Sequence, residues 1–99
     1  MTFTLLTLRT SPGRRDELVD YYRSASILEA SNALAAHVLI PADDPDTIVV
    51  TALWADADAC VAWQNSPRRQ EFAGSMASFF DSADAVSTRE FHVAHHTAQ

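Results

Sequence analysis

The stretch that decides the fold is residues 54–72, WADADACVAWQNSPRRQEF. It starts at the end of an apolar, β-branched run and passes into a short helix that ends at Trp63. Asp56 or Asp58 can cap that helix, because a carboxylate accepts hydrogen bonds from the free N–H groups of a first turn. Ser66 can cap a second helix, with a proline in the first helical position, where no N–H is needed. The stretch therefore predicts a strand followed by a helical region in two parts.

The flanking sequence predicts further strands and a long helix. Residues 14–29 place apolar side chains at i, i+3, i+4 and i+7, which is the period of an amphipathic helix. Runs of apolar and β-branched residues predict strands at 3–9, 34–40, 47–54 and 86–95. The order is β-α-β-β-α-β, the ferredoxin-like α+β order, with an antiparallel sheet and helices on one face. We expect a single domain over residues 1–99.

Both faces of the predicted sheet are apolar. In the strand at 47–54, Val49 and Leu53 point to one face, whereas Ile48, Val50 and Trp54 point to the other. Helices on one side can cover only one of these faces. A second copy of the chain is the simplest cover for the other face, so the sequence predicts a homodimer.

The composition argues against several classes of partner. Apolar residues make up 47% of the chain, which is enough for a core. The formal net charge is −6, and because an acidic protein repels phosphate backbones, nucleic-acid binding is not expected. The chain begins without a signal-peptide pattern, and no apolar run approaches the ~18 residues of a membrane span. We therefore expect a soluble, cytoplasmic protein that binds neither nucleic acid nor membranes.

Metal and disulfide chemistry are not expected either. Cys60 is the only cysteine, which excludes an internal disulfide and a cysteine-rich metal site. On a strand, His92 and His95 point to opposite faces, while His92 and His96 stand roughly 13 Å apart, too far to share an ion. The aspartates within 43–46 lack the glycine and terminal Glu of a calcium loop, so they predict a solvated turn.

The chain resembles the antibiotic-biosynthesis monooxygenase family in its length, its strand order, its Pro12-Gly13 turn and the spacing from Trp54 through Trp63 to Phe72. The pattern covers nearly the whole chain, and the specific motif covers about twenty residues. The resemblance implies a dimeric α/β barrel in which two sheets pack face to face. It also implies a pocket between the sheet and the helices of each subunit. The best-known members oxidise reduced polycyclic aromatic polyketides to quinones without metal or flavin.

The family motif carries over to this chain only in part. Trp63 matches the pocket tryptophan of the family. Ala59 stands where the quinone-forming members usually have Asn, four residues before that tryptophan. Haem-degrading relatives need an Asn in the first strand and a His about ten residues after the tryptophan. Here residues 3–9 contain no Asn, and Ala73 stands ten residues after Trp63, which argues against haem degradation.

The candidate catalytic residues are Trp63, His37 and Arg89. Trp63, which the resemblance places in the pocket, can donate its indole N–H to a bound oxygen and stack on a flat substrate. His37 is a lone imidazole in an apolar strand and can serve as a base or a donor. Arg89, if it points inward, can stabilise a phenolate or enolate. The alternatives are core packing for Trp63, a hydrogen-bonded core or surface position for His37, and a surface ion pair for Arg89.

The candidate substrate-binding residues are Phe72, Met76 and Phe79, which lie at helical spacing on one apolar face. An aromatic wall suits a flat polycyclic ligand, although packing of the helix on the sheet explains such a face equally well. Trp54 and Cys60 are expected in the core, with the dimer interface as the other position for Trp54.

Three functions remain open from the sequence. The first is a cofactor-independent monooxygenase that oxidises a reduced aromatic polyketide to a quinone, with no metal or flavin. The second is a non-redox polyketide cyclase or isomerase on the same scaffold, which needs a base and an oxyanion donor. The third is a non-catalytic dimer that binds a small molecule. The alanine at 59 favours the second and third functions.

Overall fold

The sheet forms in the predicted order. The computed structural model describes residues 1–97 and contains a four-stranded antiparallel sheet with the strand order β2-β3-β1-β4. Its strands are β1 (Thr2–Arg9), β2 (Ala35–Leu39), β3 (Thr47–Trp54) and β4 (Val86–His92). Strand β4 is shorter than predicted because its partner strand, β1, has no residue left to pair beyond His92. Thr2, which pairs with His92, is the first residue of β1. The predicted hairpin of β2 and β3 is confirmed by their antiparallel pairing.

The helices differ from the prediction mainly at Ser26, where the backbone adopts a left-handed conformation. The helix expected at 14–29 is two helices, α1 (Arg15–Ser24) and α2 (Ile27–Ala30). Ser26 lies between them with a φ of 55°, a left-handed conformation that cannot continue a helix. The split second region is confirmed as α3 (Ala57–Gln64) and α4 (Pro67–Met76). Two short 3₁₀ helices follow, η1 (Ala77–Phe79) and η2 (Ala83–Ala85).

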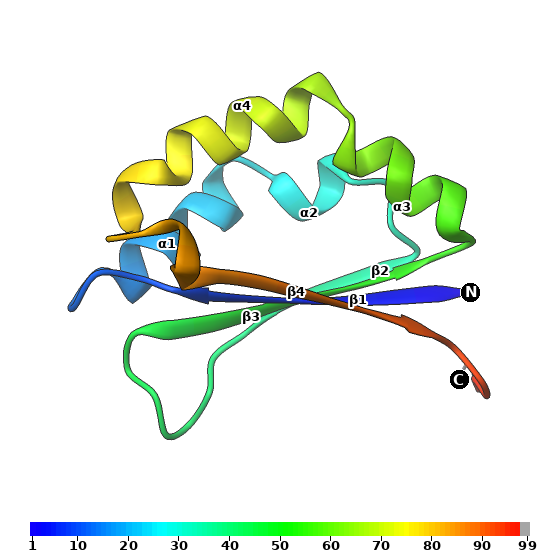
Figure 1. Cartoon of the computed structure of the whole chain (residues 1–99), viewed down its shortest axis with the longest axis horizontal. Coiled ribbons are helices and arrows are strands. Elements are labelled where there is room, and N and C mark those ends of the chain that lie inside the picture. The colour runs from blue at the N-terminus through cyan, green and yellow to red at the C-terminus, as the bar shows by residue number, and fades with distance from the viewer. Residues whose placement is uncertain (98–99) are drawn as a thin grey trace.

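The core lies between one face of the sheet and the helices. Figure 1 shows α1, α2, α3 and α4 on the same side of the four strands. The main buried cluster joins strands β1 and β3 to α1 and α2 through Leu8, Leu18, Tyr22, Ile27, Ile48 and Val50. A second cluster of Ala52, Trp54 and Cys60 lies toward α3. Trp63 packs against both clusters, so α3 is anchored to the whole core.

The other face of the sheet has no helix over it in the described part of the chain (Figure 1). Directly paired residues share a face, and Leu53 pairs with both Phe3 and Ala35. Phe3 also pairs with Phe91, and their ring centres lie 6.1 Å apart. The predicted alternation along β3 is therefore confirmed. We call this surface the open face.

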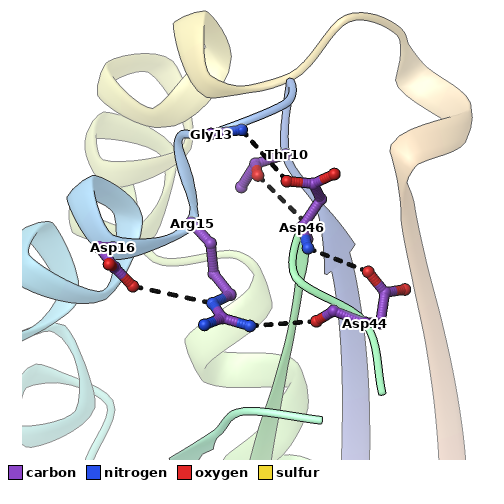
Figure 2. A network of polar contacts seen from close by, with 6 residues as sticks. All are labelled: Thr10, Gly13, Arg15, Asp16, Asp44 and Asp46. Atoms are coloured by element: carbon purple, nitrogen blue, oxygen red, sulfur yellow. Dashed lines mark hydrogen bonds and ion pairs between the residues drawn. The ribbon is translucent and has the colours of Figure 1, made fainter. Parts of the chain in front are cut away.

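A polar network ties the β2–β3 loop to the turn between β1 and α1 (Figure 2). The backbone oxygen of Asp46 accepts hydrogen bonds from the N–H of Thr10 at 2.7 Å and from its hydroxyl at 3.1 Å. The Asp46 carboxylate accepts from the N–H of Gly13 at 3.1 Å, and Arg15 donates to the backbone oxygen of Asp44 at 3.1 Å. Gly13 has a φ of 81°, which suits glycine. The aspartates thus brace the loop, whereas the sequence predicts only a solvated turn.

No helix within residues 1–97 combines the length and the apolar character that a bilayer crossing requires.

Candidate functional site

A cavity lies between the sheet and the helices. Its volume is about 130 Å³. The sheet contributes side chains from the covered face, among them Thr4, Leu6, Val50, Ala52 and Thr88. The helices contribute Tyr22, Ile27, Leu28, Cys60, Trp63, Gln64, Arg69, Phe72 and Met76. The lining is mostly apolar with a few polar groups, which is the usual character of a small-molecule site.

Two capped helices hold the aromatic side of this cavity in place. The Asp56 carboxylate accepts a hydrogen bond from the N–H of Ala59 at 2.8 Å, so Asp56 caps α3. The Ser66 hydroxyl accepts one from the N–H of Arg68 at 3.2 Å and caps α4, as predicted. The Ser66 N–H also donates to the backbone oxygen of Trp63 at 3.0 Å. The junction of α3 and α4 is therefore fixed by backbone bonds beside Trp63.

The two tryptophans of the chain line the cavity in different ways. Trp54 is 3% exposed, and its indole N–H donates to the Thr4 hydroxyl at 3.0 Å. Trp63 is only half-buried, and its ring centre lies 6.4 Å from that of Phe72 at an interplanar angle of 45°. Its indole N–H has no hydrogen-bond partner within the described residues. The donor of Trp54 is thus used by the fold, whereas the donor of Trp63 forms no hydrogen bond within the described residues.

The polar groups around the cavity are few and have unusual surroundings. Tyr22 is 5% exposed, and burial raises its pKa to about 12, against the opposing effect of the Arg69 charge. Its hydroxyl is therefore protonated at neutral pH and can donate a hydrogen bond. Burial also raises the pKa of the Cys60 thiol, and Gln64 donates to that sulfur at 3.5 Å. Within residues 1–97, no group of three or more His, Cys, Asp or Glu side chains is arranged to hold a metal ion.

The structure brings together only some of the candidate residues. Trp63, Phe72 and Met76 all line the cavity. Phe79 packs elsewhere, with its ring centre 6.3 Å from that of Tyr21 and 4.5 Å from the guanidinium carbon of Arg14. The helix that was expected to continue through Phe79 ends at Met76 and tightens into a 3₁₀ turn, which rotates Phe79 off the α4 face.

His37 and Arg89 lie on the open face, away from the cavity. His37 pairs with Thr51, Thr51 pairs with Leu5, and Leu5 pairs with Arg89, so these residues form one row across the sheet. The cavity is lined instead by the alternate residues of the same strands, such as Leu6. A catalytic role for His37 or Arg89 stays a prediction, and it gains no support from the position of the cavity.

Sequence reasoning missed the residues that give the cavity its polar character. Tyr22 falls within the apolar stripe of residues 14–29, and Arg69 follows the predicted cap at Ser66, but the sequence gives neither residue a role in the site. One signal was available for Arg69. It lies six residues after Trp63, at the start of a helix, where a negative side chain is the usual choice.

A second hollow adjoins the first beneath α4. Its volume is about 360 Å³. Leu6, Arg69, Ala73, Met76 and Thr88 line both hollows, and the second extends toward Phe80, Asp81 and Val86. The shared lining places Arg69 and Met76 at the junction. A ligand longer than one ring system can therefore extend from one hollow into the other.

Comparison with known proteins bears on the identity of this fold. Three of the solved structures that are similar over almost the whole chain illustrate the likeness. A protein of unknown function from Nitrosomonas europaea is 20% identical, with a TM-score of 0.80, over 99% of this chain and 93% of that one. A protein from Deinococcus radiodurans, named for the antibiotic biosynthesis monooxygenases, is 14% identical, with a TM-score of 0.80, over 100% and 98%. A protein from Mycobacterium tuberculosis is 11% identical, with a TM-score of 0.78, over 98% of each chain.

These identities support the fold alone. No curated protein matches the chain significantly. The family model for antibiotic biosynthesis monooxygenases, however, matches residues 1–75, which is most of the chain. The chain therefore belongs to the antibiotic biosynthesis monooxygenase family.

Proposed function

We propose that this chain binds a flat, reduced aromatic molecule in the cavity and oxidises it with O₂ without a bound cofactor. The observation that carries the proposal is the wall formed by Trp63 and Phe72, in which the indole N–H of Trp63 has no partner among the described residues. An aromatic wall suits stacking of a flat ring system, and a free donor beside it suits a developing oxyanion or peroxide. Family membership supports the same reaction class.

The reaction balances without any further reagent. An anthrone-type phenol loses a proton, and the electron-rich anion transfers one electron to O₂. The resulting radical pair combines, so that one oxygen of O₂ becomes bonded to the ring carbon as a peroxide. The peroxide then eliminates water and leaves a carbonyl. The methylene carbon has lost two hydrogens and gained one oxygen atom, and the second oxygen atom has left in the water.

The roles of the residues follow from their surroundings. The phenol of Tyr22 is protonated at neutral pH, because burial raises its pKa to about 12, so it acts as a donor and not as a base. Trp63 provides a second donor. The residues that line the first hollow include no Asp, Glu or His, and the substrate must therefore lose its proton to water or arrive already ionised. His37 and Arg89 are given no part in this reaction, since they lie on the open face.

A homodimer is part of the same proposal. The open face carries apolar side chains such as Phe3, Leu53 and the 47% exposed Leu39. Packing two such faces together removes this apolar surface from water. The cavity lies on the opposite side of each sheet, so each subunit keeps its own cavity.

A non-catalytic binding protein is the second candidate. The lack of a carboxylate or imidazole among the residues of the first hollow favours it, as does Ala59 in the place of an asparagine. A cyclase or isomerase is less well supported, because such a reaction needs a base at the substrate.

Oxygen labelling tests the proposal. The purified protein is incubated with 1,8-dihydroxyanthrone under ¹⁸O₂, with a protein-free blank to correct for spontaneous oxidation. We expect uptake of one O₂ per quinone formed and one ¹⁸O atom in the new carbonyl, at a rate proportional to protein concentration. Binding without any excess oxidation over a panel of anthrones and dihydroquinones would favour the binding protein. Product formation without O₂ uptake would identify a non-redox enzyme.

A further inference from the structure

Arg69 is a cation at the junction of the two hollows. It is the third residue of α4, it is half-buried, and it lines both hollows. Across residues 1–97 its guanidinium forms neither a hydrogen bond nor an ion pair with another residue. The side chains of Arg14, Arg15 and Arg23 have hydrogen-bond or ion-pair partners, whereas those of Arg9, Arg68 and Arg89 have none within the same residues. Arg14 pairs with Glu17 at 2.9 Å, and Arg23 pairs with Asp20 at 3.4 Å.

The position of Arg69 in its helix is unfavourable for stability. The N-terminal end of a helix carries partial positive charge and favours Asp or Glu. The first turn of α4 has no acidic residue and contains both Arg68 and Arg69. Neither helix stability nor an internal ion pair accounts for a cation at this place. Residues that break a local rule without a structural gain are candidates for function.

No carboxylate forms a direct contact with Arg69 within residues 1–97, although Glu90 pairs with Thr4 on the covered face of the sheet. The first hollow has no carboxylate in its lining, and Arg69 is its only charged residue among those described. Asp81 lines the second hollow, but it accepts a hydrogen bond from the Ser11 hydroxyl at 2.6 Å.

The charge of Arg69 acts on Tyr22, whose pKa it lowers against the larger effect of burial. At Cys60, burial and then the Glu90 charge raise the pKa, and Arg69 opposes both. The lining of the first hollow is therefore mostly apolar, and Arg69 is the charged side chain in it.

We propose that Arg69 is the anion-binding residue of this cavity and that the ligand is a flat aromatic compound carrying an ionised oxygen, either a carboxylate or a phenolate. The ring lies against Trp63 and Phe72, and the anionic oxygen accepts hydrogen bonds from the guanidinium. This inference rests on the proposed function only for the aromatic nature of the ligand. For a phenol, the same contact lowers the pKa of the bound hydroxyl, so that the substrate can lose its proton to water.

Matched probes test the assignment under nitrogen, where no oxidation takes place. Binding of 2-naphthoate and of the isosteric, neutral 2-naphthamide is measured by calorimetry for the wild type, Arg69→Gln and Arg23→Gln. Arg23 is the control because it is exposed on α1 and its replacement changes the net charge equally. We expect Arg69→Gln to weaken 2-naphthoate binding roughly 10- to 100-fold, the usual effect of a charge-assisted hydrogen bond, with 2-naphthamide unchanged. Arg23→Gln should leave both affinities unchanged.

A second arm separates the two kinds of anion. The ionisation of bound 2-naphthol is followed by its absorbance as a function of pH. A phenolate site lowers the pKa of the bound naphthol in the wild type by roughly one unit or more relative to Arg69→Gln, since one unit corresponds to a tenfold preference. A naphthoate effect without this shift assigns the site to carboxylates, and either result supports Arg69 as the anion site.

Three outcomes would overturn the inference. One is an Arg69→Gln variant that changes neither naphthoate affinity nor naphthol ionisation. Another is equal weakening of naphthoate and naphthamide, which would show a structural effect, and the third is that no probe binds to the wild type. Folding of Arg69→Gln is checked by its melting temperature, which we expect to be unchanged or higher because a cation leaves the helix N-terminus. Arg69-dependent binding without O₂ uptake would contradict the monooxygenase proposal and leave this inference intact.

Discussion

Replacing Trp63 with phenylalanine separates its stacking surface from its hydrogen-bond donor. Trp63 packs against both core clusters and is half-buried, so Trp63→Phe removes volume from a contact that anchors α3. The expected loss is roughly 1–3 kcal/mol in the free energy of unfolding. The indole N–H has no partner in the described structure, so no internal hydrogen bond is broken. Because small domains have roughly 5–15 kcal/mol of stability, the variant should fold.

The effect on function should fall mainly on turnover. Phenylalanine keeps a flat ring beside Phe72, so the affinity for an aromatic ligand should change little. A donor to negative charge that develops during the reaction acts mainly in the transition state. Its loss should lower kcat roughly 10- to 100-fold, which corresponds to about 1.5–3 kcal/mol. The measurements are O₂ uptake with 1,8-dihydroxyanthrone, calorimetric binding of 2-naphthoate and thermal denaturation.

The matched control is Trp54→Phe. Trp54 already donates its N–H to the Thr4 hydroxyl at 3.0 Å and is 3% exposed. Its replacement leaves that hydroxyl without its donor and opens space in the core, so stability should fall. Because the Trp54 N–H is already used by Thr4, kcat per folded molecule should fall less than in Trp63→Phe. If Trp63→Phe lowers the melting temperature but leaves turnover and binding unchanged, Trp63 is a packing residue. The proposed donor would then have to be sought elsewhere in the cavity.

The remaining predictions concern assembly, capping and titration. The wild type should sediment as a dimer at micromolar concentration and Leu53→Arg, which puts a charge on the open face, as a monomer; a monomeric wild type would refute the interface. Asp56→Ala should lower the free energy of unfolding by about 1 kcal/mol and Asp58→Ala by less, because only Asp56 caps α3; equal thermal shifts would contradict this. The protonated Tyr22 phenol should stabilise the fold fully below pH 10.0, the ordinary pKa of tyrosine, and lose this effect as the pH rises to about 12. Denaturation of Tyr22→Phe over this range should lack that dependence, and an unchanged slope would count against a buried phenol.

The sequence contained enough local information to predict the elements. The run of β-branched and apolar residues at 47–54 gave the observed bounds of β3, because alternation and composition agree there. The cap at Ser66 was also predictable, since a side-chain oxygen there precedes a helical run, and the cap of α3 was predictable as either Asp56 or Asp58. The break at Ser26 was not, because serine at a positive φ has no compositional signal comparable to glycine.

The position of side chains relative to the cavity depends on long-range pairing. One face of β2 and β3 packs on the helices, but both faces carry apolar residues, so the alternation of side chains could not say which face holds the cavity. His37 and Arg89 are catalytic candidates by residue type alone. In the structure they lie in one row with Thr51 and Leu5, and this row is on the open face. The end of β4 at His92 likewise depends on where its partner strand begins.

Arg69 shows how a candidate site residue can be identified from an unfavourably placed charge once the fold is known. In the sequence it is one member of an arginine pair, which is most simply explained as a solvated surface. In the structure it is half-buried at the start of α4, next to the protonated phenol of Tyr22 and without a carboxylate partner among the described residues. A cation at the positive end of a helix is tolerated in such surroundings only at a cost in stability. A bound anion would remove that cost. Saturating 2-naphthoate should therefore raise the melting temperature of the wild type and leave that of Arg69→Gln nearly unchanged.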